Sequence, residues 1–63
     1  MINYSNLVGK KIKLLNMVDP FPLKRGLIGK ITNFEKPNTL YVNWNNGSTL
    51  KIFIGIDEFE ILE

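Results

Sequence analysis

The sequence predicts an all-β fold, and three of its features carry that prediction. Apolar and polar residues alternate with a period of two, as in the runs 11–14 and 40–44. β-Branched and aromatic residues recur in these runs, and Gly, Pro, Asn and Asp cluster between them. The 3.6-residue spacing of an amphipathic helix is poor throughout. We therefore expect short strands joined by tight turns.

The turn clusters divide the chain into four or five strands. We expect them at about 10–17, 27–34, 39–44, 48–54 and 60–62. The connection at 55–59 has a suitable length for one turn of 3₁₀ helix. Gly26 and Gly29 bracket the start of the second strand, where a bend or a close approach of two backbones requires a residue without Cβ.

The chain has 63 residues, too few to divide between two cores, so we expect one domain over 1–63, with 1–7 as an N-terminal arm. Short strands in a chain of this length bury a useful core only if the sheet curls onto itself. The prediction is a small SH3-like antiparallel barrel of about five strands, with one short 3₁₀ turn near the C-terminus.

The hairpin over 39–54 has two candidate registers. A two-residue turn at 46–47 would bury Lys51 opposite Val42. A three-residue loop at 45–47, with Gly47 in the left-handed conformation, makes one face uniformly apolar instead. This second register, which we expect, pairs Trp44 with Ser48, Val42 with Leu50 and Leu40 with Ile52. It turns Tyr41, Asn43, Thr49, Lys51 and Phe53 to the opposite face.

Composition argues against most enzyme classes, because the chain has neither Cys nor His. Thiolate nucleophiles, imidazole bases, disulfides and the usual zinc or haem ligands are therefore absent. Asp57, Glu58 and Glu60 lie within four residues but lack the spacing of an EF-hand loop. The run Gly26-x-x-Gly29-Lys30 leads into a strand, not into a phosphate-binding helix. We expect no enzyme, no metal and no cofactor.

The sequence also bounds location and charge. It contains no apolar run of roughly 20 residues and no secretory leader, so we expect a cytoplasmic protein with no membrane partner. The net charge is +2, and it is unevenly distributed: 1–36 carry seven Lys/Arg against two Asp/Glu, and 37–63 carry one against four. One interpretation is that the basic residues form a face that binds phosphate or an acidic partner. The other is that the fold brings both halves together and the charged side chains only solvate its surface.

Two regions are candidates for recognition of a partner protein. The outward face of the hairpin offers Tyr41, Lys51 and Phe53, unless the two rings are packing partners covered by the N-terminal arm. The loop 17–23 is too apolar for an ordinary solvated connection. It either folds back as a lid, which we favour, or offers Phe21 to a partner, while Asp19 closes an Asx-type turn.

Nucleic acid is the alternative partner. A basic face next to the aromatic rings would bind phosphates and stack bases. Its residues would be Lys11, Lys13, Lys30 and Lys51.

Two motifs carry a resemblance to a known family. They are the loop Met17-x-Asp19-Pro20-Phe21-Pro22 and the hairpin Val42-x-Trp44-x-Asn46-Gly47. With them, nearly the whole chain after Leu7 resembles an uncharacterised family of small SH3-like proteins, a domain of unknown function carried by phages and bacterial mobile elements. This chain departs from the family at Asn45, commonly aspartate, and at Ile54, commonly proline.

The resemblance implies a genomic setting more than an activity. Phage accessory proteins of this size often bind a host protein stoichiometrically, and some inhibit a defence protein such as a CRISPR nuclease. A shorter segment, Gly26-x-x-Gly29-Lys30-Ile31, is similar to the KOW motif of barrels that bind RNA or protein. The expected function is a non-catalytic, protein-binding module, with a nucleic-acid-binding barrel as the alternative.

Overall fold

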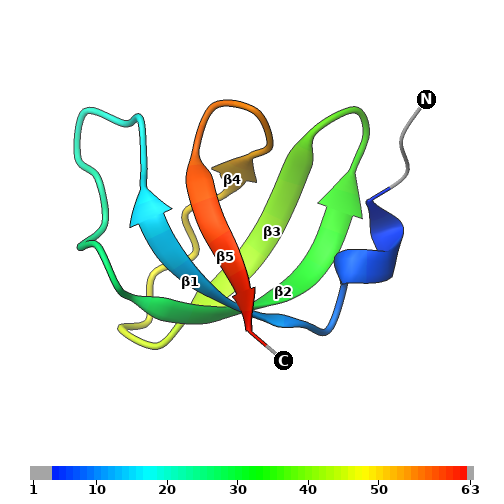
Figure 1. Ribbon diagram of the computed structural model, residues 1–63, viewed down its shortest axis with the longest axis horizontal. Coiled ribbons are helices and arrows are strands. Elements are labelled where there is room, and N and C mark those ends of the chain that lie inside the picture. The colour runs from blue at the N-terminus through cyan, green and yellow to red at the C-terminus, as the bar shows by residue number, and fades with distance from the viewer. Residues whose placement is uncertain (1–3, 63) are drawn as a thin grey trace.

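The computed structural model describes residues 4–62 (Figure 1). A short 3₁₀ helix, η1 (Ser5–Leu7), precedes five strands. The strands are β1 (Lys11–Asn16), β2 (Ile28–Glu35), β3 (Thr39–Trp44), β4 (Ile52–Phe53) and β5 (Glu58–Leu62). They form one antiparallel sheet in the order β4-β3-β2-β1-β5. The all-β prediction with five strands is confirmed.

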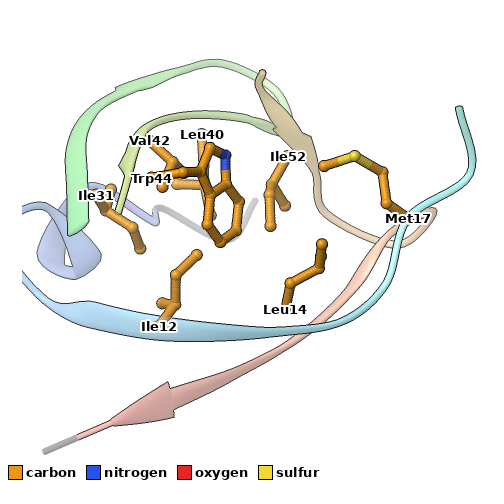
Figure 2. Close-up of a cluster of buried hydrophobic side chains, with 8 residues drawn as sticks. All are labelled: Ile12, Leu14, Met17, Ile31, Leu40, Val42, Trp44 and Ile52. Carbon is orange, nitrogen blue, oxygen red and sulfur yellow. The ribbon is translucent and has the colours of Figure 1, made fainter. Parts of the chain in front are cut away.

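The sheet bends around a single hydrophobic core. Alternation along β1 buries Ile12 and Leu14 and turns Lys11 outward. In Figure 2 the side chains of β1 face those of β3 and β4 across the interior. The buried apolar side chains are Ile12, Leu14, Met17, Ile31, Leu40, Val42, Trp44 and Ile52. No helix within residues 4–62 is long and apolar enough to cross a bilayer.

Gly29 marks the close approach that the sequence predicts at the start of β2. It lies opposite Trp44 of β3. A Cβ at this position would come within 2.7 Å of side-chain atoms of both Trp44 and Val42. The Trp44 ring can therefore lie against β2 only because residue 29 has no side chain.

The β3–β4 hairpin has the expected register. Leu40 pairs with Ile52, the Trp44 N–H donates to the Ser48 carbonyl at 3.1 Å, and Gly47 has a φ of 88°. The apolar face is confirmed, with Leu40, Val42, Trp44 and Ile52 buried and Leu50 half-buried. Asn43, Thr49, Lys51 and Phe53 are exposed and Tyr41 is half-buried, as this register requires.

Two details of this region differ from prediction. The fourth strand spans two residues instead of 48–54, and the pairing of Val42 with Leu50 does not form. The cause is local: the Leu50 carbonyl accepts the Trp44 Nε1–H at 2.9 Å, and the Leu50 N–H donates to Ser48 Oγ at 3.2 Å. Both backbone groups of Leu50 are thereby withdrawn from the strand pairing.

The 3₁₀ helix predicted near the C-terminus is misplaced, since the one within residues 4–62 is η1. At 53–57 the N–H groups of Ile56 and Asp57 both donate to the Phe53 carbonyl, which closes a single hydrogen-bonded turn. Of the expected arm 1–7, residues 1–3 lie outside the described part of the chain.

Candidate functional site

The loop 17–23 is only partly the lid that the sequence suggested. Met17 is buried and Leu23 is half-buried against the core, but Val18 is 64% and Phe21 is 85% exposed. The Asx turn at Asp19 explains why the backbone turns away from the core here: Asp19 Oδ1 accepts the Phe21 N–H at 2.9 Å, as predicted. Figure 1 shows this connection, cyan to green, projecting from the sheet. The lid prediction is therefore wrong for Val18 and Phe21.

Asp57 joins this loop to the end of β4. Its side chain accepts the Val18 N–H at 2.8 Å through Oδ1 and the Phe53 N–H at 2.9 Å through Oδ2. The residue is 5% exposed, a burial that a carboxylate tolerates because it is hydrogen-bonded. The sequence interpretation grouped Asp57 with the neighbouring glutamates and missed this role, since its partner Val18 lies 39 residues away.

Exposed apolar residues occur on the two segments that meet at this junction. The backbone N–H groups of Val18 and Phe53 donate to the same carboxylate, and Ile56 lies in the turn closed on the Phe53 carbonyl. Together with Phe21 they make up four of the five large hydrophobic residues exposed within residues 4–62; the fifth is Val8. Exposed apolar groups that cluster mark an interaction surface more reliably than scattered ones.

A groove runs between the loop and the segment that enters β4. Asp19 lines it from the loop, and Thr49, Leu50, Lys51 and Phe53 line it from the other side. Its volume is about 440 Å³. The fold therefore brings together three of the five residues predicted to bind a partner, Asp19, Lys51 and Phe53, although the sequence analysis placed Asp19 in a different region from the other two.

Tyr41 extends this surface over the outer face of β3. The Lys51 Nζ lies over the Tyr41 ring, 5.2 Å from the ring centroid. The phenol donates to Glu35 Oε1 at 2.7 Å. This hydrogen bond to a carboxylate, then desolvation and the negative charge of Glu35, raise the pKa of Tyr41. Glu35 was not among the predicted site residues.

The N-terminal segment does not pack over these rings where it is described. Tyr4 instead makes an edge-to-face contact with Phe34, with 5.8 Å between the ring centroids. Phe53 is 40% exposed. Both Tyr41 and Phe53 therefore retain accessible ring surface.

The four lysines of the alternative nucleic-acid site differ in their contacts. Lys11 and Lys30 are exposed and lie directly opposite each other on β1 and β2. Lys13 is in an ion pair with Glu60, with 3.8 Å between Nζ and Oε1. Lys51 lies over Tyr41. The structure thus places Lys11 and Lys30 as a facing pair on the sheet, while Lys13 and Lys51 each have a different partner.

Asp57, Glu58 and Glu60, which lie close together in the sequence, do not form a set of potential metal ligands in the structure. Residues 4–62 contain no group of three or more potential metal-ligating side chains. Asp57 uses both carboxylate oxygens for backbone N–H groups, while Glu60 faces Lys13.

Comparison with known proteins identifies a family without a known activity. No curated protein and no solved structure matches the chain. One family profile, described as Domain of unknown function (DUF4314), matches residues 3–62. Because this match covers nearly the whole chain, the protein belongs to the DUF4314 family.

Proposed function

We propose that this protein is a non-catalytic binding module that acts by stoichiometric binding to another protein. The binding surface is the groove together with Tyr41 and Phe21. One observation carries the proposal: Phe21 is 85% exposed and lies two residues from Asp19, which lines the groove.

The exposure of Phe21 has an energetic consequence. Burial of a phenylalanine side chain contributes about 1.5–3 kcal/mol, whereas a domain of this size has only about 3–5 kcal/mol of stability from its core. The Asx turn at Asp19, between Met17 and Leu23 at the core, nonetheless leaves Phe21 in water. Aromatic side chains of this kind are frequent energetic centres of protein interfaces.

The resemblance supports a more specific setting. A small protein from a phage or mobile element would act in the cytoplasm of its bacterial host, and a host defence protein such as a CRISPR nuclease would be its partner. The SH3-like identity of the curled sheet belongs to this same proposal. The family has no assigned activity, so the class of partner is a matter for the experiment below.

Affinity capture with a matched pair of variants tests the proposal. We expect the tagged chain to retain a host protein in a one-to-one ratio, and F21S to lose it with an unchanged melting temperature. The control is V8S, which removes another exposed apolar side chain away from the groove. Equal retention by F21S and the unaltered chain would refute the proposal, as would equal losses in both variants.

A nucleic-acid-binding barrel is the second candidate, and the facing pair Lys11 and Lys30 favours it. Like charges directly opposite each other on adjacent strands are unfavourable, and a phosphate between them would remove that repulsion. This function would give retention on single-stranded DNA or RNA that weakens steeply as salt rises. K11E and K30E should each weaken this retention on nucleic acid, whereas F21S should leave it unchanged.

A further inference from the structure

The segment that enters β4 has an open backbone edge. Leu50 directs its N–H to Ser48 Oγ and its carbonyl to the Trp44 indole, so its backbone groups are used within the fold. Thr49 and Lys51 flank Leu50 in the segment that leads into β4. Within residues 4–62, the backbone groups of Thr49 and Lys51 have no hydrogen-bond partner.

This edge lies at the groove. Thr49, Leu50 and Lys51 line one side and Asp19 lines the other. A volume of about 440 Å³ is enough for part of a short peptide, since ligand sites commonly span about 300–1,000 Å³. Because β4 is at the end of the strand order, no further strand of the described sheet covers this side. An unpaired edge beside a groove is the arrangement to which extended segments add as an extra strand.

The side chains along the edge specify the chemistry of the added segment. Lys51 and Phe53 are two residues apart and both are exposed on the outer face. The Lys51 ammonium lies over the Tyr41 ring and has no carboxylate within ion-pair distance among the described residues. A carboxylate near the Lys51 ammonium would therefore gain a charge-assisted contact. The backbone of Phe53 is already bonded to Asp57 and Ile56, but an apolar side chain laid against its exposed ring would be removed from water.

We propose that the partner protein contributes an extended segment that pairs with the backbone of Thr49 and Lys51. This segment carries a carboxylate and an apolar side chain two residues apart, which face Lys51 and Phe53. The inference rests on the proposed protein-binding function and names the part of the partner that the groove accepts. Backbone pairing provides affinity, and the two side chains provide specificity.

A displayed library of random 12-residue linear peptides tests this directly. We expect selection on the intact chain to enrich peptides with Asp or Glu two residues from an apolar residue. A synthetic peptide of the enriched sequence should slow amide exchange at Thr49 and Lys51 by tenfold or more. K51E should weaken its binding at least tenfold, while the matched variant K30E, on the exposed face of β2, should bind it as the unaltered chain does.

Three results would overturn the inference: no enrichment of any peptide, binding without slowed exchange at Thr49 and Lys51, or equal losses of affinity in K51E and K30E. The capture experiment with F21S and V8S tests the proposed function independently of the strand addition. If F21S loses the host protein while the peptide results are negative, the protein binds its partner in another way and only the strand addition is wrong. If F21S retains the host protein, the proposed function itself fails.

Discussion

Tyr41 connects two charged side chains on the outer face of β3. It donates to Glu35 Oε1, and its ring lies beneath the Lys51 ammonium. The period of two along β3 predicts that Tyr41 faces outward, but it does not show which carboxylate the phenol meets. Glu35 reaches it because Tyr41 lies opposite Asn33, two residues before Glu35 on β2.

The pKa of Tyr41 tests this contact. The hydrogen bond and charge of Glu35 raise that pKa above the ordinary value near 10, so E35Q should lower it toward that value. We expect a titration of the Tyr41 ring resonances by NMR to show the decrease. E60Q, which alters a carboxylate paired with Lys13 instead, should leave the pKa of Tyr41 unchanged.

The sign of the linked stability follows from the raised pKa. The folded state holds the phenol proton more tightly than the unfolded state, so this contribution is complete below the unfolded pKa near 10. It is lost as pH rises through the pKa of folded Tyr41. The melting temperature should fall more steeply above pH 10 for the unaltered chain than for E35Q; identical slopes would contradict the contact.

At the scale of elements, the Asp57 carboxylate holds the loop 17–23 against the junction of β4 and β5. D57N leaves one oxygen to accept and turns an amide group toward a backbone N–H. We expect a loss of about 1–3 kcal/mol in the free energy of unfolding, the cost of one unsatisfied buried group, in urea denaturation. Amide exchange at Val18 and Phe53 should also become faster.

E58Q is the control for this change, because Glu58 is the adjacent, exposed carboxylate. It should alter the free energy of unfolding by no more than about 0.5 kcal/mol. Comparable losses in D57N and E58Q would mean that net charge, and not the two hydrogen bonds, explains the effect.

At the scale of the whole molecule, one small hydrophobic core stabilises the fold, while the large aromatic side chain of Phe21 lies outside it. Leu14 is fully buried, and L14A should cost about 2–5 kcal/mol in the free energy of unfolding. That loss is comparable with the whole stability of a domain this small, about 3–5 kcal/mol. We therefore expect a substantially unfolded population at 25 °C by circular dichroism.

F21A provides the contrast, because the side chain that it removes is 85% exposed. We expect it to melt within a few degrees of the unaltered chain. A loss as large as that of L14A would show that Phe21 stabilises the fold and is not reserved for a partner.

The sequence by itself determined the features that depend on near neighbours in the chain. Alternation set the strands and their inward and outward faces, and the cost of burying Lys51 selected the hairpin register. The Asx turn at Asp19 was predictable because donor and acceptor are two residues apart. The prediction of a domain of unknown function is confirmed by the family match, whereas the phage setting stays a prediction.

Only the tertiary structure decided how distant segments meet. The Asp57 carboxylate accepts the Val18 N–H, which lies 39 residues earlier in the chain. Within the hairpin, the Trp44 indole donates to the Leu50 carbonyl, which the period of two did not predict. These contacts place Asp19 beside Lys51 and Phe53 in one groove. The alternation of apolar and polar residues predicts which side of a strand is buried. It does not predict which polar group, far away in the chain, accepts a hydrogen bond from a buried backbone N–H.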